Sequence, residues 1–236
     1  MRIFAAVGIA LLLASCASGG RSFSDREQFN RVRGKAVANP SAIVAAELSF
    51  ARLAQEKGQW TAFRETATDD AVMFTPNKVN AQAWLKGKAD PKTAVEWQPH
   101  KIFVSCDGSL GVSKGAWQAA NGNTGHFTTI WRQEGFGQRD FRKDAEWKWV
   151  FDDGVPLEQP LEEPDFIETE VASCKGNVTP VSATDIGSGS ASGQSIDGTL
   201  TWQAIANADK SRSVSVSLWD GSNWNKVLTY EASASE

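Results

Sequence analysis

Apolar residues recur at helical spacing near the start of the chain. The pattern follows an Asn-Pro pair suited to a helix start and stops at a glycine, so it predicts an amphipathic helix over 40–57. Shorter helices are predicted over 60–67 and 81–86, the second of them capped by Asn80. The apolar face of the first helix consists of Ile43, Ala46, Phe50, Leu53 and Ala54.

After residue 92 the period changes to that of strands. Asp107-Gly108 and Asn121-Gly122 are strong hairpin signals, and together with the flanking apolar runs they indicate an antiparallel meander. Strands are predicted over 95–105, 110–118, 125–133 and 147–151, and a short buried strand is predicted over 72–74. Turns are predicted at 69–70 and at 152–154. Three further strands are predicted over 199–204, 213–219 and 224–231.

The first residues are organised like an export signal. Arg2 precedes an apolar run over 3–13, which is much shorter than the roughly 20 residues that a membrane-spanning helix needs. The sequence Leu-Ala-Ser-Cys at 13–16 resembles the lipobox of bacterial lipoproteins, which implies removal of residues 1–15 and a lipid anchor, with palmitate among its acyl chains, on Cys16. The absence of Asp after Cys16 implies the outer membrane, facing the periplasm. The alternative is an ordinary secretory signal with a coincidental cysteine.

Charge and cysteine content narrow the function classes. A net charge of −4 argues against nucleic-acid binding, which needs a basic face. Two histidines without a CxxC motif give no metal site, and no cofactor motif is present. Once Cys16 carries lipid, Cys106 and Cys174 remain, and an oxidising compartment favours a disulfide between them. The alternative is a buried free thiol at Cys106 with Cys174 exposed.

Residues 42–154 resemble the nuclear transport factor 2-like superfamily, which includes the SnoaL-like and ketosteroid isomerase proteins. The resemblance implies an α+β fold in which N-terminal helices pack on a curved antiparallel sheet around a conical pocket. It rests on segments at 45–51, 58–63, 70–74, 128–131 and 146–152. The expected organisation is a signal peptide (1–15), a tether (16–38), the superfamily domain (39–154), a Pro/Glu-rich then Gly/Ser-rich linker (155–198) and a three-stranded β extension (199–236).

The sequence offers few catalytic candidates. Isomerase relatives need a pocket carboxylate and a neutral donor such as Tyr, but Tyr230 lies outside the resembling region. His126 opens a strand that would line the pocket and is a candidate general base, although a strand histidine with an ordinary hydrogen bond is the simpler interpretation. His100 follows a proline and is expected at a surface bulge, whereas Asp152 and Asp153 are expected to form a turn.

Tryptophan is the best indication of a ligand. The chain has ten Trp and one Tyr, and so many rings on few strands fit either sheet packing or a ring-lined pocket. The candidate ligand-binding residues are Trp97, Trp117, His126, Trp131 and Trp149.

These observations favour a non-catalytic, lipid-anchored, periplasm-facing module that binds a small molecule or has a structural role. The alternative is a small lyase or isomerase acting on an apolar carbonyl compound. Two or more titratable groups at one cavity would favour the enzyme, and a ring-lined cavity without them would favour binding. The expected partners are the membrane, through the lipid, and an apolar small molecule, with a homodimer left open.

Overall fold

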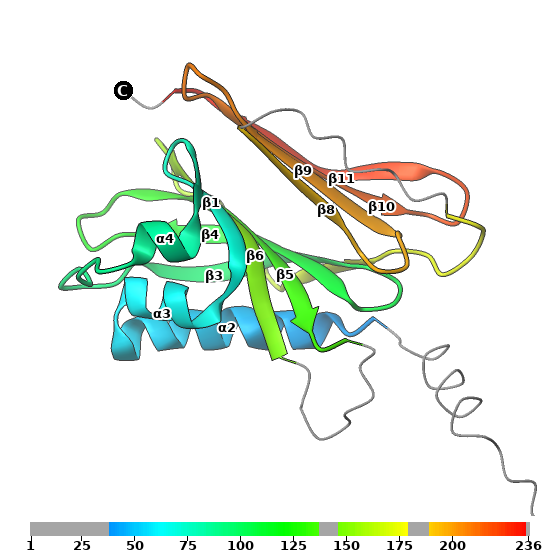
Figure 1. Ribbon diagram of the computed structural model, residues 1–236, viewed down its shortest axis with the longest axis horizontal. Helices are drawn as coiled ribbons and strands as arrows, with labels where there is room; N and C mark the ends of the chain where they lie inside the picture. The colour runs from blue at the N-terminus through cyan, green and yellow to red at the C-terminus, as the bar shows by residue number, and fades with distance from the viewer. Residues whose placement is uncertain (1–37, 137–145, 179–188, 235–236) are drawn as a thin grey trace, which may run out of the picture. The chain divides into compact units, whose positions relative to one another are not determined.

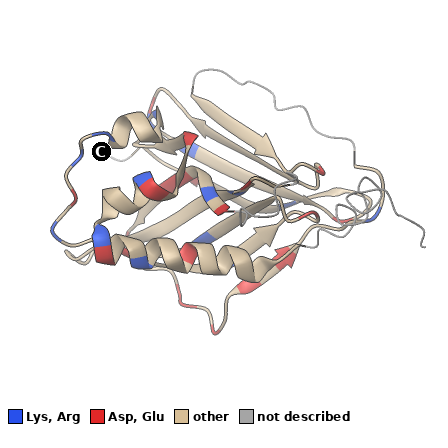
Figure 2. Cartoon of the chain, turned by 60° about the horizontal axis from the view of Figure 1, so that its bottom comes forward, with Lys and Arg blue, Asp and Glu red and all other residues tan. Residues whose placement is uncertain are grey.

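The computed structural model describes residues 38–136, 146–178 and 189–234 of the chain. Within these ranges the helices are α2 (Pro40–Lys57), α3 (Gln59–Thr66) and α4 (Ala81–Leu85). None of these described helices is long and apolar enough to cross a membrane, and α2, the longest, carries both acidic and basic residues along its length (red and blue in Figure 2). The proposed signal peptide and most of the tether lie outside the described residues.

Seven strands form a large mixed sheet in the order β2-β1-β6-β5-β4-β3-β7. The strands β3 to β6 are antiparallel neighbours, as the hairpin signals predict. Two pairings are parallel, β1 with β6 and β3 with β7. The bounds are β1 (Ala67–Phe74), β2 (Lys78–Asn80), β3 (Glu96–Val104), β4 (Leu110–Gln118), β5 (Thr124–Glu134), β6 (Glu146–Leu157) and β7 (Glu168–Val171).

The C-terminal part forms a second, antiparallel sheet in the order β11-β10-β9-β8. In Figure 1 the helices lie on one side of the large sheet and the second sheet lies on the other. The bounds are β8 (Ser190–Gln194), β9 (Leu200–Ala206), β10 (Arg212–Trp219) and β11 (Trp224–Ala232).

The large sheet is buried on both faces. One apolar cluster joins the helices to the sheet and includes Ile43, Phe50 and Trp149. A second cluster joins the large sheet to the second one, through residues such as Phe151 and Trp202. The rings of these last two residues lie 5.2 Å apart. Because both faces of the sheet are covered, apolar residues occur at odd and at even positions of the central strands and do not alternate with polar ones.

The disulfide between Cys106 and Cys174 is confirmed. It joins the end of β3 to the segment after β7, with a Cα–Cα distance of 5.2 Å across 68 positions of sequence. It therefore fixes the segment that leads into the second sheet to the large sheet.

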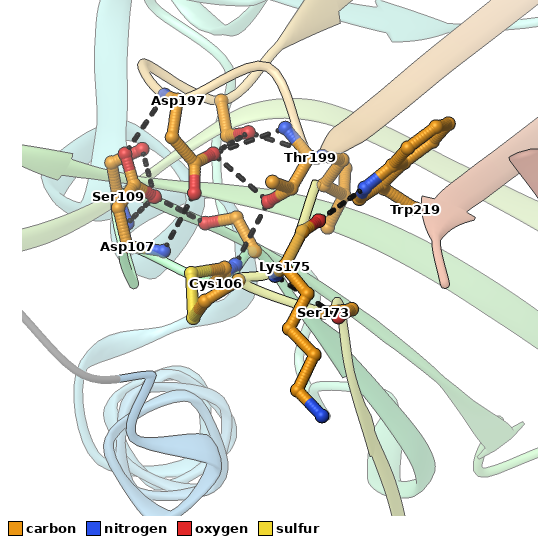
Figure 3. The surroundings of a disulfide bond; sticks show 12 residues. Cys106, Asp107, Ser109, Ser173, Lys175, Asp197, Thr199 and Trp219 are labelled. Atoms are coloured by element: carbon orange, nitrogen blue, oxygen red, sulfur yellow. Dashed lines mark hydrogen bonds between the residues drawn. A yellow bond between two sulfur atoms is a disulfide. The ribbon is translucent and has the colours of Figure 1, made fainter. Parts of the chain in front are cut away.

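Two hairpin turns of similar sequence face each other beside this disulfide (Figure 3). One spans 105–110 with the sequence SCDGSL, and the other spans 195–200 with the sequence SIDGTL. The amide of Asp107 donates to Oδ2 of Asp197 at 2.9 Å, and the amide of Asp197 donates to Oδ2 of Asp107 at 3.0 Å. Each turn thus satisfies a backbone donor of the other, which ties the two sheets together at this end.

The predicted fold class is wrong. Strands dominate the described residues, with eleven strands in two sheets against three helices, so the chain is not a set of N-terminal helices packed on one curved antiparallel sheet. The parallel pairings contradict the antiparallel prediction. The physical reason is that hairpin turns encode antiparallel neighbours locally, whereas parallel neighbours are joined by long connections that carry no turn signal.

The C-terminal extension and two turns also differ from prediction. The extension has four strands, because Ser190–Gln194, predicted as linker, pairs with β9. Asp152 to Gly154 continue β6, and Asp69-Asp70 lies inside β1, where the register shifts. On the apolar face predicted for the first helix, Phe50 is buried, whereas Leu53 is half-buried.

Candidate ligand-binding site

A cavity of about 260 Å³ lies between the helices and the large sheet. Residues from α2, α3, α4 and five strands contribute to its wall, so the cavity is built by the whole helical side of the domain. Most of the wall is aromatic, from Phe50, Trp60, Phe63, Phe74, Trp84, Trp97, Trp117 and Phe127. Asp152 is the titratable residue among the described residues that line it.

The rings that the helices and β3 contribute to the wall contact one another edge to face. The Phe50 ring lies 4.8 Å from that of Phe63 and 4.9 Å from that of Trp97. Trp60 lies 5.6 Å from Phe63 and 5.4 Å from Trp84. Such contacts hold the rings against one another, which lowers the cost of ordering them when a ligand binds.

The Trp117 ring is positioned by a hydrogen bond from its indole nitrogen and by the small size of Gly125. Its indole Nε1 donates to the backbone carbonyl of His126 at 3.0 Å. A Cβ atom placed on Gly125, which pairs with Trp117 across the strands, would lie 2.4 Å from the indole ring. The absence of a side chain on Gly125 therefore leaves the room that the Trp117 ring occupies.

Asp152 is the polar group of the cavity. It lies on β6, is 8 % exposed, and accepts a hydrogen bond of 2.8 Å from the Thr129 hydroxyl on β5. Burial raises the pKa of Asp152 to about 8, and the charges of Glu47 and Asp153 add to this rise, while the bond from Thr129 opposes it. At neutral pH this carboxyl group holds a proton and can donate or accept a hydrogen bond.

A second buried carboxyl group lies behind the cavity wall. Glu47 on α2 is fully buried and accepts hydrogen bonds from Trp97 Nε1 at 2.7 Å, from Trp131 Nε1 at 3.0 Å and from the Ser113 hydroxyl. Burial raises the pKa of Glu47, and the three hydrogen bonds oppose the rise. Its role is to hold the Trp97 ring in the wall, which makes Glu47 a positioning residue.

His126 does not face the cavity. Phe127 and Thr129 of β5 line the cavity, so the alternation of a strand turns His126 toward the second sheet. Its ring lies 4.6 Å from that of Tyr230, and its Nδ1 has no hydrogen-bond partner among the described residues. Burial and nearby positive charges lower the pKa of His126 to about 4, so the ring is neutral at pH 7.

Asp153 shares that opposite face. It accepts a hydrogen bond of 2.8 Å from the Tyr230 hydroxyl and lies 3.5 Å from the Arg212 guanidinium, both on the second sheet. Burial raises the pKa of Asp153, while the Arg212 charge lowers it. Asp153 is therefore compensated by a basic partner.

The structure divides the residues that the sequence singled out. Trp97 and Trp117 line the cavity, whereas Trp131 and Trp149 are buried in the core and bonded to Glu47 and Thr66. His100 lies beside the expected bulge but is buried, not on the surface.

Sequence reasoning missed most of the wall. Trp60 and Phe63 were assigned to a helix without a role, and Trp84 was not singled out. The signal that could have found Asp152 is the unbroken β6 pattern, because a strand that continues past Phe151 turns Asp152 and Asp153 to opposite faces. No group of three or more His, Cys, Asp or Glu side chains suited to a metal ion occurs among the described residues.

Comparisons with known proteins leave the function open. No family model matches the chain, and no curated protein matches it. Among solved structures, a candidate aromatic ring hydroxylase from Novosphingobium aromaticivorans is similar at 12% identity and a TM-score of 0.35. The match covers 52% of this chain and 91% of that one. Likeness at this level carries no argument about fold or function, so the superfamily resemblance stays a prediction.

Proposed function

We propose that this protein binds a small organic molecule with a ring-bearing or otherwise apolar body in the cavity between its helices and its large sheet. The observation that carries the proposal is an interlocked aromatic wall around one buried carboxyl group, Asp152. Ligand pockets of proteins are typically apolar with a few placed polar groups. The rings would bury the body of the ligand, and Asp152 would fix its orientation through one hydrogen bond.

A neutral aromatic probe tests the proposal. We expect 2-naphthol, which offers two fused rings and one hydroxyl group, to bind with one-to-one stoichiometry and to quench tryptophan fluorescence. Trp60→Ala and Trp84→Ala remove wall rings that are only half-buried, so they should fold while weakening binding. Because a ring-to-ring contact contributes about 1 kcal/mol, each should weaken binding about fivefold.

The matched control is Trp224→Ala. Trp224 is half-buried as well, but it pairs with Trp219 on the second sheet, outside the cavity. This variant should bind 2-naphthol as the wild type does. Absence of saturable binding, or an equal loss in the control, would contradict the proposed function.

We further propose that the protein is held at the cell envelope by a lipid on Cys16, at the outer membrane and facing the periplasm. The support is the Leu-Ala-Ser-Cys sequence after a short apolar run. Labelled palmitate should enter the wild-type protein and sediment with membranes. Cys16→Ala should remain unlabelled and lose membrane association, and a variant that still partitions as the wild type does would refute the anchor.

Proton transfer is the second candidate function, and the pKa of about 8 at Asp152 favours it, because such a group exchanges protons near neutral pH. Asp152 is the one titratable group among the described residues that line the cavity. Since two or more such groups would favour an enzyme, binding is the first proposal. An apolar ketone such as 2-tetralone gives the test. Exchange of its α-protons with D₂O that is lost in Asp152→Asn would establish catalysis, and exchange at the buffer rate would exclude it for this ketone.

A further inference from the structure

Among the residues that the structure describes, neither Asp152 nor Glu47 has a basic partner. Lys, Arg and His are all absent from the described residues that line the cavity. The donors to Asp152 and Glu47 are neutral, namely the Thr129 hydroxyl for the first and two indole groups and a hydroxyl for the second. Asp153, the next residue along β6, shows the contrast, because it faces away and is paired with Arg212. Arg212 thus supplies a positive charge beside Asp153, whereas no described residue that lines the cavity supplies one beside Asp152.

The aromatic wall is suited to supplying the rest of a cation site. The faces of indole and phenyl rings carry negative electrostatic potential and attract ammonium groups, most strongly for Trp. Trp84 already engages a cation, since the Lys88 ammonium lies 3.6 Å from the centre of its ring. Trp60, Trp97 and Trp117 are also part of the wall.

We propose that the ligand of this cavity is an organic cation, a quaternary ammonium or protonated amine on an apolar body, bound with its charge beside Asp152 and against the indole rings. This inference rests on the proposed function and specifies its ligand class. A ligand carboxylate or phosphate would instead approach Asp152, and no basic residue is among the described residues that line the cavity to receive it, so anions are disfavoured.

The same arrangement predicts that binding of a cation releases a proton. The groups that act on Asp152 are the Thr129 hydroxyl from β5, Glu47 from α2 and Asp153 from β6 itself. With a pKa of about 8, Asp152 must ionise to pair with a cation, so cation affinity should rise by about tenfold per pH unit up to about pH 8 and then level off. A neutral ligand should show no such rise.

Two molecules of the same shape test the charge alone. Calorimetric titrations would compare phenyltrimethylammonium with its neutral isostere, tert-butylbenzene, at pH 6 and pH 8, because neither molecule titrates in this range. We expect the cation to bind at least tenfold more tightly than the isostere at pH 8. Asp152→Asn should reduce this preference to near parity while leaving the affinity for the isostere unchanged.

The control variant is Asp70→Asn, which removes an acidic group that is exposed and paired with Arg132 on another part of the sheet. It should keep the full preference for the cation. If the neutral isostere binds as tightly as the cation, or if Asp152→Asn keeps the preference, the cation inference fails while the binding function stands. If the cation, the isostere and 2-naphthol all fail to bind, the proposed function fails as well.

Discussion

Replacing Asp152 by Asn should stabilise the protein, and by an amount that grows with pH. The asparagine amide matches the protonated carboxyl group in shape and can still accept the hydrogen bond from Thr129, but it never has to be held in a protonated form. When the wild-type chain folds, the Asp152 carboxyl group becomes buried, so it must either take up a proton or be buried as a charge, and both cost free energy. The variant removes that cost.

The size of the effect follows from the change in pKa on folding. The ordinary value for Asp is 3.8, and in the folded protein burial raises the pKa of Asp152 to about 8. A carboxyl group with a raised folded pKa contributes fully to stability below the unfolded value and loses that contribution as pH rises through the folded value. At about 1.4 kcal/mol per unit, the variant should be more stable by about 4 kcal/mol at pH 7, and the difference should stop growing above about pH 8.

Urea unfolding of both proteins at intervals from pH 4 to pH 9 measures this difference directly. The two stabilities should coincide near pH 4 and separate as pH rises. Asp70→Asn is the control with the opposite sign, because the hydrogen bond from Arg132 lowers the pKa of that exposed carboxyl group. Its effect should be a loss below about 1 kcal/mol, since exposed pairs are screened by solvent. A pH-independent difference between wild type and Asp152→Asn would refute the reasoning.

Three further substitutions probe the core and the seam between the sheets. Replacing Cys106 and Cys174 together by Ser should cost up to about 4 kcal/mol in urea unfolding, because the disulfide closes a loop of 68 positions, and an unchanged midpoint would contradict this. Arg212→Met leaves Asp153 without its basic partner and should cost about 3–5 kcal/mol at neutral pH, a loss that should shrink on acidification as Asp153 is protonated; a constant loss would count against the ion pair. Phe50→Ala should cost about 3–5 kcal/mol by thermal unfolding, and a loss below 1 kcal/mol would show that the helix does not depend on this ring.

Local signals in the sequence were enough for most elements. The strand Leu110–Gln118 has the predicted bounds, because turn residues mark both of its ends. Asn80 caps α4 as predicted, since its side chain accepts a hydrogen bond of 2.9 Å from the amide of Ala83. Each of these features depends on residues within a few positions of one another.

The features that failed depend on distant residues. The Gly/Ser-rich run before Gln194 was predicted to be a flexible linker, but its small residues allow close packing. A Cβ atom on Gly193 would lie 2.7 Å from the Trp202 indole, and one on Gly189 would lie 2.2 Å from the Ala206 carbonyl oxygen. Low complexity here reflects a strand pressed against β9, and only the pairing partner reveals it.

The face of each strand residue was equally hidden. In a sheet with one face exposed to solvent, polar and apolar residues alternate along each strand, and this alternation would show which way His126 points. Here both faces of β5 are buried, so His126 and Phe127 are equally compatible with either side. The candidate histidine was therefore assigned to the cavity, whereas Thr129 and Phe127 of the same strand are the residues that line it.

The second sheet explains why the Asp152 carboxyl group points into the cavity. Two acidic residues before a glycine would ordinarily form a turn, yet β6 stays extended because it pairs with β5 along this stretch and with β1 at Asp152. Arg212 and Tyr230 hold Asp153 from the far side of the sheet. Because successive side chains of a strand alternate, fixing Asp153 toward the second sheet necessarily points Asp152 toward the helices. The C-terminal sheet thus contributes to the ligand site without contacting it, by determining which of two neighbouring acids enters the cavity.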